Sequence, residues 1–294
     1  MTQAAEPPKD PGTLPPGLYV VATPIGAARD VTLRALDVLA AADVLAAEDT
    51  RSLRRLMDIH GVALRGRRIL SYHDHNGAAR RPQLLAALAE GRSLAYCSEA
   101  GTPLVADPGY RLVREAAAAG HAVHPVPGPS AAIAALSVAG LPTDRFLFAG
   151  FPPPQAGPRD RWVAEIAAVP ATLVLYETGR RMGALLSAFV AAGHGAREAA
   201  LCRELTKLHE EVRRAPLAAL SEAFAEAGEG RGEMALVIGP PPRGAPERAE
   251  IEAELREALG ELPLKQAAAR VAEKLGAGKR DVYQIGLALK KDGS

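Results

Sequence analysis

The stretch Leu94–Cys97, followed by Ser98-Glu99-Ala100-Gly101-Thr102-Pro103, decides how the rest of the chain is interpreted. Leu94–Cys97 is an apolar run of the kind that forms a buried parallel strand. After it, Leu112–Ala119 has the spacing of an amphipathic helix, and Gly120 ends that run. Open α/β sheets bind ligands in small-residue loops between a strand's carboxyl end and the next helix, because bare backbone amides point into the crevice there. The loop Ser98–Pro103 is therefore a candidate binding loop.

The glycine spacing narrows the class of ligand. The G-x-G-x-x-G fingerprint of dinucleotide-binding folds does not occur in the chain. Residues 276–280 resemble a phosphate loop, but the first glycine is missing and Arg280 stands where Ser or Thr would bind magnesium. The loop is more compatible with an adenosine carrying a zwitterionic tail, held by backbone groups and small side chains.

Composition is that of an ordinary soluble protein. The chain has 294 residues, 48% hydrophobic and 23% charged, with a net charge of +1, so two or three domains are expected. Its two cysteines, Cys97 and Cys202, lie in separate apolar runs and are interpreted as buried free thiols in a reducing cytoplasm, not as a disulfide or metal pair. No apolar run reaches about 18 residues, so no membrane span is expected. Residues 1–16 carry five prolines and no apolar core, and are expected to form a disordered tail instead of a secretion signal.

Alternating strand-like and helix-like runs predict an α/β fold. The first half offers five strands with helices between them, which implies a mostly parallel sheet covered on both faces. From Arg145 the rhythm changes and a second α/β region of similar size begins. A Pro- and Gly-rich linker, residues 239–244, precedes three short helical runs. We therefore predict α/β domains at 17–126 and 127–240, a ligand cleft between them, and a helical module at 245–294.

Polar residues follow two of the predicted strands. Glu48-Asp49-Thr50-Arg51 comes directly after the strand Val44–Ala47, and either forms part of a site or caps the next helix through Asp49 or Thr50. His73 and His75 follow another strand. They are interpreted as part of a polar loop and not as metal ligands, because no further ligand cluster lies nearby in the sequence. The first helix is expected to bury Leu33, Leu36 and Leu39.

Seven motifs in one order carry a family resemblance. They are Ala22–Gly26, Ala47–Arg51, Ser71–Asn76, Ser98–Pro103, Asp107–Arg111, Pro127–Ser130 and Ala200–Lys207. In these motifs the chain resembles the ribosomal RNA small subunit methyltransferase I family of the tetrapyrrole methylase superfamily. The match runs from about residue 17 to 240, and the helical tail is similar to the family's C-terminal domain.

The resemblance implies an activity, a cofactor and partners. The expected reaction is 2'-O-methylation of a decoding-centre cytidine in 16S rRNA with S-adenosyl-L-methionine as the donor. The substrate would be the rRNA or the assembled small ribosomal subunit in the cytoplasm. The resemblance also implies a homodimer and a cofactor bound in the cleft between the two α/β domains.

The resemblance also implies roles for individual residues. Expected cofactor contacts are Thr23, Pro24, Ala100, Gly101, Thr102, Ser130, Ala131, Tyr176, Glu177 and Met234. Expected RNA contacts are Arg51, His73, His75, Arg203 and Lys207. A carboxylate or imidazole that accepts the 2'-hydroxyl proton would raise the nucleophilicity of the oxygen, and the candidates are Glu48, Asp49, Glu204 and His73. Glu48 or Asp49 is favoured, because both sit at a strand end ahead of a helix.

Several positions depart from the family pattern, and two other functions stay open. Ala27 stands where Asn is usual, Glu99 where Asp is usual, and Thr178–Arg181 replaces Ser-Pro-His-Arg. Glu99 keeps the charge, so the cofactor site is expected to be retained. One alternative is a methylase acting on a corrin or porphyrin precursor, which the arginine-rich first domain argues against. The other is a binding protein that uses the cleft as a sensor.

Overall fold

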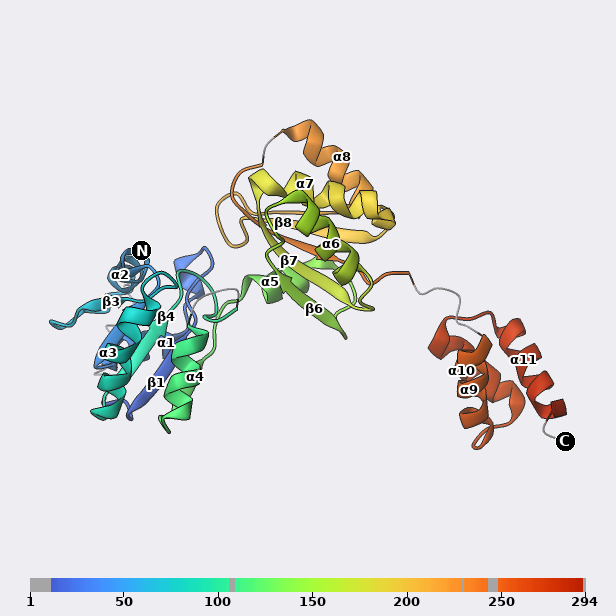
Figure 1. Cartoon of the computed structure of the whole chain (residues 1–294), viewed down its shortest axis with the longest axis horizontal. Coiled ribbons are helices and arrows are strands. Elements are labelled where there is room, and N and C mark those ends of the chain that lie inside the picture. The colour runs from blue at the N-terminus through green and yellow to red at the C-terminus, as the bar shows by residue number, and fades with distance from the viewer. Residues whose placement is uncertain (1–11, 106–108, 229, 243–247, 293–294) are drawn as a thin grey trace, which may run out of the picture. The chain divides into compact units, whose positions relative to one another are not determined.

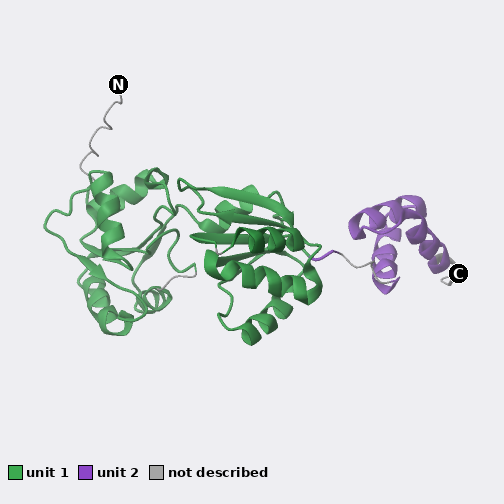
Figure 2. Cartoon of the chain, turned by 90° about the horizontal axis from the view of Figure 1, so that it is seen from above, with its two compact units in different colours: residues 1–240 green, residues 241–294 purple. Residues whose placement is uncertain are grey.

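The protein forms two compact units, residues 1–240 and 241–294 (Figure 2). The computed structural model describes residues 12–105, 109–228, 230–242 and 248–292. Most of the expected tail, residues 1–11, lies outside these ranges. Leu14 is described and packs against the first hydrophobic core.

The first lobe of the larger unit is built on a parallel sheet with the strand order β3-β2-β4-β1-β5. The strands are β1 Gly17–Val21, β2 Val44–Ala47, β3 Ile69–Ser71, β4 Ser93–Cys97 and β5 Val123–Val126. The helices are α1 Leu33–Ala41, α2 Thr50–Ile59, α3 Gly77–Ala89 and α4 Tyr110–Ala118, and a short 3-10 turn covers Ala28–Asp30 (Figure 1). The predicted parallel sheet is confirmed.

Helices cover both faces of this sheet. Neighbouring residues of each strand point to opposite faces, so each strand contributes side chains to two cores. Leu45 and Ala47 of β2 pack in one core with residues of α1 and α2. Val44 and Ala46 pack in a second core with residues of α3 and α4. Since all five strands run in the same direction, the loops after β1, β2, β4 and β5 open at the same edge of the sheet.

The buried face of α1 differs from the prediction. Thr32 caps the helix by accepting a hydrogen bond from Ala35 N at 3.2 Å, which makes Leu33 the first helical residue. Leu33 is 80% exposed, and Val38 and Leu39 are buried with Ala35. The expected face was wrong at Leu33, because the first turn of the helix extends beyond the core it covers.

The second lobe has a mixed sheet with the order β6-β7-β10-β8-β9. Only β6 and β7 pair in parallel; the other described pairs are antiparallel. The strands are β6 Phe146–Gly150, β7 Thr172–Thr178, β8 Glu198–Arg203, β9 Glu211–Pro216 and β10 Glu233–Ile238. The helices are α5 Ala131–Ala139, α6 Ala156–Ala167, α7 Gly179–Phe189 and α8 Leu217–Ala227, with a π-helical turn at Val190–His194.

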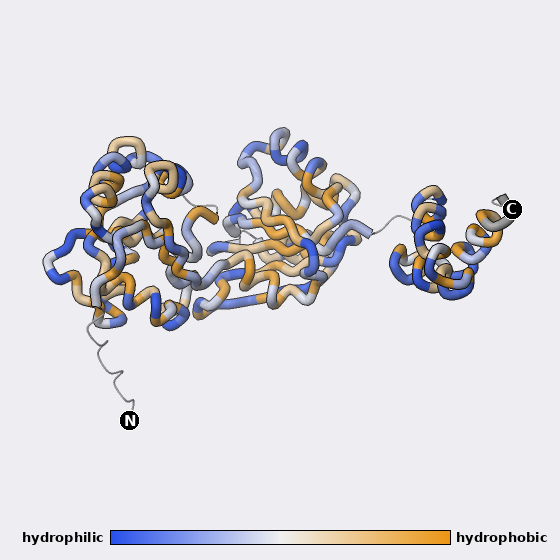
Figure 3. The backbone as a smooth tube through the Cα atoms, turned by 90° about the horizontal axis from the view of Figure 1, so that it is seen from below, coloured by the Kyte–Doolittle hydropathy of each residue, from blue (hydrophilic) through white to orange (hydrophobic). Residues whose placement is uncertain are grey.

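The two faces of this second sheet are covered differently. Leu173, Leu201 and Leu236 pack with residues of α6, α7 and α8. On the opposite face, Val174 and Cys202 pack with residues of α5. The centre of this lobe is largely hydrophobic in Figure 3, as expected for a sheet covered on both sides. Because α5 packs on this second sheet, it belongs to the second lobe; domain limits at 17–126 and 127–240 stay a prediction.

A buried arginine fixes the end of β10. Arg197 is 4% exposed, and its guanidinium donates to Ala167 O at 3.0 Å and, through two nitrogens, to Gly239 O. Burial lowers the pKa of Arg197 to about 10. Carbonyl oxygens thus take the place of a carboxylate partner for this cation.

The smaller unit is a bundle of three helices with its own core. They are α9 Arg248–Leu259, α10 Leu264–Leu275 and α11 Lys279–Asp292. Ile251, Leu255, Val271 and Val282 are among the residues that fill the core. None of the described helices in either unit has the length and apolar character that crossing a bilayer requires.

Candidate active site

A cleft of about 670 Å³ is lined by residues from both lobes of the larger unit. Loops after β1, β2, β4 and β5 form one side, and the ends of β7, β8 and β10 contribute to the other. The volume lies within the range of about 300–1,000 Å³ typical of small-molecule sites. Nine of the ten expected cofactor contacts line this cleft: Pro24, Ala100, Gly101, Thr102, Ser130, Ala131, Tyr176, Glu177 and Met234.

Thr23, the tenth expected contact, lies behind the wall of the cleft. Its backbone pairs with Gly101 in both directions, at 2.9 Å and 3.0 Å. Its residue exposure is 4%, and its hydroxyl oxygen is buried with no hydrogen-bond partner among the described residues. An unpaired buried hydroxyl costs about 1–3 kcal/mol, and such groups occur where an ion, a water or a ligand completes the bonding.

The loop after β4 holds its shape through its own side chains. Ser98 Oγ donates to Gly101 O at 3.2 Å, and Thr102 Oγ1 donates to Pro129 O at 2.9 Å. Gly101 has φ +79°, a conformation that glycine adopts without the strain a side chain would bring. The surface that Ala100–Thr102 offers to the cleft is therefore mainly backbone and small side chains. Asp107, which belongs to the next motif, lies outside the described residues.

Aromatic side chains stand at the second-lobe wall of the cleft. Tyr176 lines the cleft and packs edge-to-face against Phe148, with ring centroids 4.8 Å apart, and against Phe151, at 5.6 Å. Phe151 also lines the cleft and is 53% exposed. Flat aromatic faces of this kind are suited to contact an adenine ring.

The carboxylate of Glu177 is occupied by contacts inside the protein. Arg181 donates to its Oε2 at 2.7 Å and 2.9 Å, and Thr178 N donates to its Oε1 at 2.8 Å. Glu177 is 3% exposed. The part of the cleft lining at Glu177 is thus better suited to offer backbone groups than a free carboxylate. The groups that hold this carboxylate, the Thr178 amide and the Arg181 guanidinium, do not depend on the residues that depart from the family pattern.

Glu48 reaches the cleft from the end of β2. Its Oε2 accepts a hydrogen bond from Glu99 N at 3.2 Å. Burial raises the pKa of Glu48, and the negative charges of Glu99 and Asp74 add to this rise against the opposing effects of the Glu99 amide and His73. A carboxylate with a raised pKa is a stronger proton acceptor, which is the property that a general base requires.

Asp49 is used to cap a helix. Its Oδ1 accepts hydrogen bonds from Arg51 N at 2.7 Å and Ser52 N at 3.4 Å, at the N-terminus of α2. The bond from Arg51 N is the main cause that lowers the pKa of Asp49. Asp49 is also not part of the cleft lining. The capping alternative is the one that the structure adopts, and Asp49 is a weaker proton acceptor than Glu48.

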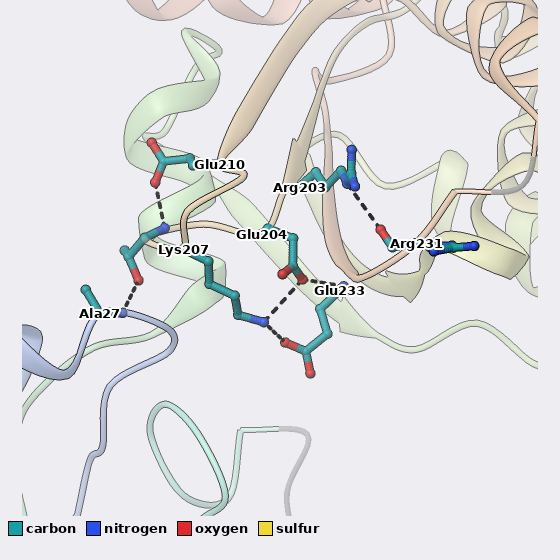
Figure 4. A network of polar contacts seen from close by, with 8 residues as sticks. Ala27, Arg203, Glu204, Lys207, Glu210, Arg231 and Glu233 are labelled. Atoms are coloured by element: carbon teal, nitrogen blue, oxygen red, sulfur yellow. Dashed lines mark hydrogen bonds and ion pairs between the residues drawn. The ribbon is translucent and has the colours of Figure 1, made fainter.

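An ion-pair network occupies the second-lobe side of the cleft (Figure 4). Lys207 Nζ donates to Glu233 Oε2 at 2.8 Å and to Glu204 Oε1 at 3.2 Å, and Glu233 N donates to Glu204 Oε1 at 2.9 Å. The Glu233 amide is the main cause that lowers the pKa of Glu204, and Lys207 adds to it. Burial lowers the pKa of Lys207, but its carboxylate partners outweigh this and the net shift is upward. The network therefore offers a stable cation and a weakly basic Glu204.

The loop that carries Lys207 touches the first lobe. Ala27 N donates to Thr206 Oγ1 at 3.0 Å. A Cβ on Gly26 would lie 2.6 Å from both Thr206 Oγ1 and Lys207 Cγ. Glu204 and Thr206 have φ +49° and +62°, values that non-glycine residues seldom adopt and that are often found at functional sites. The hydrogen bond from Ala27 to Thr206 uses only the backbone amide of Ala27. It therefore forms even though Ala27 stands where the family pattern has Asn.

The expected RNA contacts are not gathered in one place. Lys207 lines the cleft, whereas the Arg51 side chain is 92% exposed on α2. The rings of His73 and His75 pack edge-to-face, with centroids 5.9 Å apart, beyond the cleft lining. Arg203 lines a different cavity. No group of three or more His, Cys, Asp or Glu within the described ranges is placed to hold a metal ion.

Three polar residues of the cleft were not singled out from the sequence as cleft residues: Ser52, Arg55 and Glu233. Ser52 and Arg55 are three residues apart on α2, so helical spacing predicts that they lie on the same face of this helix. The helix begins within the motif Glu48–Arg51, which is the signal that could have placed both residues near the site. Glu233 precedes the apolar run of β10, and no local pattern marks it.

Comparisons with known proteins agree with this fold. The family model for tetrapyrrole (corrin/porphyrin) methylases matches residues 17–221, and a model described as the RsmI C-terminal HTH domain matches residues 245–290. Among solved structures, the methyltransferase CobJ superposes with a TM-score of 0.60 at 16% identity, covering 79% of this chain and 97% of that one. A uroporphyrin-III-C-methyltransferase from Thermus thermophilus gives 0.53 at 24% identity, covering 76% and 93%. At these identities the likeness concerns the fold alone.

Sequence relatives are more specific. A protein of Mesorhizobium japonicum named ribosomal RNA small subunit methyltransferase I is 48% identical over 94% of this chain and 93% of its own length. The protein of the same name from Escherichia coli O157:H7 is 44% identical over 92% and 94%. Because identity of this level extends over nearly the whole length and the methylase model covers most of it, the chain belongs to the ribosomal RNA small subunit methyltransferase I family of the tetrapyrrole methylases.

Proposed function

We propose that this protein transfers a methyl group from S-adenosyl-L-methionine to the ribose 2'-hydroxyl of a decoding-centre cytidine in 16S rRNA. The observation that carries the proposal is the 48% identity, over nearly the full length, to a protein named for methylation of small-subunit ribosomal RNA. The cleft supports it by combining small-residue loops with a carboxylate of raised pKa. The choice of nucleotide and of the 2'-oxygen rests on the motif resemblance.

The residues of the cleft fit the proposed donor. Backbone and small side chains of Ala100–Thr102, Ser130 and Ala131 would hold its polar tail, and Tyr176 offers an aromatic face for its adenine. The unpaired hydroxyl of Thr23 is a further polar group available behind the loop. When bound, the donor supplies an electrophilic methyl group on a sulfonium. A surface with few charged side chains at these loops suits a centre whose positive charge disappears during the reaction.

Glu48 is the proposed proton acceptor. As the ribose oxygen forms its bond to the methyl carbon and the carbon–sulfur bond breaks, the hydroxyl proton passes to the Glu48 carboxylate. Its raised pKa suits this role better than the lowered pKa of Asp49 or Glu204. The Glu99 amide, 3.2 Å from Glu48 Oε2, would fix the orientation of the carboxylate.

Lys207 and Arg55 are the cations among the described residues that line the cleft, and we propose that they contact the RNA near the target. Arg51 would extend this contact along α2, where it lines an open surface hollow with Arg54 and Arg55. His73, His75 and Arg203 would act outside the cleft. We further propose that the protein works as a homodimer in the cytoplasm, on rRNA or on the assembled small subunit, with the 245–290 helical module as an additional RNA contact.

The test is methyl transfer with defined substrates. Purified protein and labelled S-adenosyl-L-methionine are incubated with small subunits or 16S rRNA, and the modified nucleotide is mapped by a ribose-methylation assay. Label in one decoding-centre cytidine is expected in wild type and not in Glu48→Gln. Label in a precorrin instead of RNA would favour the corrin or porphyrin alternative. Cofactor binding without any methyl transfer would favour a sensor.

A further inference from the structure

A second cavity, of about 250 Å³, lies on the other face of the second sheet. Residues of β8 alternate between the two faces, so Cys202 lines the cleft whereas Leu201 and Arg203 line this cavity, and Glu204, just after β8, lines the cleft again. Met234 lines both, which places the two sites on either side of one residue at the start of β10. Nothing in the proposed reaction uses this second cavity.

The described residues that line the cavity carry an excess of positive charge. They include Arg203, Arg213 and Arg231 against one carboxylate, Glu211. Arg213 pairs with Glu211, and Arg203 Nη1 lies 3.9 Å from the same carboxylate. Arg203 Nε donates to Arg231 O at 3.1 Å, a contact visible in Figure 4. The Arg231 side chain forms no ion pair within the described part of the chain. The planar, multi-donor guanidinium of arginine is the side chain best suited to bind phosphate.

The floor of the cavity is apolar. Phe224 of α8, Leu201 of β8 and Met234 of β10 line it together with the arginines. Gly230 lies against the Phe224 ring, since a Cβ there would be 2.6 Å from Phe224 Cζ. Single-stranded RNA is commonly held by an aromatic ring under a base and cations at the adjoining phosphate. A phosphate ion alone would leave this apolar floor unused.

We propose that this second cavity binds a nucleotide of the RNA strand that flanks the methylated one, with its phosphate on Arg213 and Arg231 and its base on Phe224. The proposal rests on the proposed function, because it takes the strand in the cleft to be RNA. The wall that the two sites share at Met234 is what makes a flanking nucleotide the fitting occupant. The cavity would thus add affinity and register without touching the reacting atoms.

The first test compares RNA binding by the full-length wild type, the double variant Arg213→Ala/Arg231→Ala and the control Arg161→Ala. Arg161 is exposed on α6 in the same lobe and lines none of the three described cavities. The probe is an rRNA fragment carrying the target cytidine. We expect the double variant to bind about 10- to 100-fold more weakly, with a shallower salt dependence, and the control to match wild type. S-adenosyl-L-methionine affinity and thermal unfolding should be unchanged in all three proteins, which excludes a folding defect.

The second test locates the phosphate. Single methylphosphonate substitutions, which remove one phosphate charge at a time, are introduced on each side of the target. One flanking position should weaken binding to wild type and have no further effect on the double variant, as a double-mutant cycle requires for a direct contact. Phe224→Leu should lose roughly fivefold or more in RNA affinity while keeping the same salt dependence.

The outcomes separate the two proposals. If wild type methylates the RNA and the double variant binds and methylates equally well, the second cavity is not an RNA site and the proposed function stands. If wild type binds the RNA but methylates neither the RNA nor the small subunit, the proposed function fails, and the binding comparison still decides about the cavity. If wild type binds neither the RNA nor the small subunit, both proposals are overturned.

Discussion

Replacing Gly26 by Ala tests whether the contact between the first loop and the Lys207 loop shapes the cleft. A Cβ at this position would lie 2.6 Å from Thr206 Oγ1, 2.6 Å from Lys207 Cγ and 3.0 Å from Leu205 O. These are closer than van der Waals contact, so the loop has to move. Overpacking of this kind costs about 1–3 kcal/mol, and loss of the Ala27 N to Thr206 Oγ1 bond adds about 0.5–1.5 kcal/mol.

The expected result is a free energy of unfolding lower by about 1.5–4.5 kcal/mol, the sum of these two ranges. At about 2–4 °C for each kcal/mol, the thermal midpoint should fall by several degrees. Denaturant unfolding, calorimetric titration with S-adenosyl-L-methionine and methyl transfer would be measured on the same samples. Gly157→Ala is the matched control, because its Cβ would meet Arg161 Nη1 at 3.9 Å and nothing closer. If the two variants were equally stable and active, the lobe contact would not determine the shape of the cleft.

Further predictions concern the carboxylates and the helical module. Glu48→Gln should lower the rate constant for methyl transfer about 10²- to 10⁴-fold with little change in donor affinity, as shown by single-turnover kinetics. Asp49→Ala should instead destabilise the protein by about 1 kcal/mol in denaturant unfolding, with Asp49→Asn nearly neutral because Asn also caps helices. Because a base acts when deprotonated and the pKa of Glu48 is raised, activity should fall on acidification at a pH above the range of an ordinary glutamate. Asp74→Asn should move that midpoint down and His73→Gln should move it up in pH–rate profiles. A chain ending at Pro240 should keep its donor affinity in calorimetry, since residues 241–294 form a separate unit, and bind rRNA more weakly in filter binding.

Local pattern was sufficient for the first lobe and much of the cleft. Strand β4 and the loop Ser98–Pro103 could be predicted because a parallel strand buried on both faces is a continuous apolar run and its ligand loop is a run of small residues. The expected positions Ala100, Ser130 and Tyr176 are brought to one cleft from different parts of the chain.

Other features depend on contacts that no local pattern records. Strand β9, Glu211–Pro216, is polar because it is an edge strand, and the segment does not have the apolar character by which strands are identified. Arg197 is buried on three contacts to carbonyl oxygens, which a sequence does not mark. The choice between Glu48 and Asp49 stayed open because both follow β2; the capping bonds and burial that separate them exist only in the fold.

The two buried thiols give each lobe a chemical reporter of its own. Cys97 lies in the first core and Cys202 at the cleft, and burial raises their pKa values to about 12 and about 11. At neutral pH the reactive thiolate is thus scarce in the folded protein, while an opened segment returns to a pKa near 8.5. Labelling by a thiol reagent would then proceed at the rate of local opening around each cysteine. The two labelling rates would distinguish local unfolding of the first sheet from local unfolding of the second. Donor bound in the cleft should slow modification at Cys202 more than at Cys97.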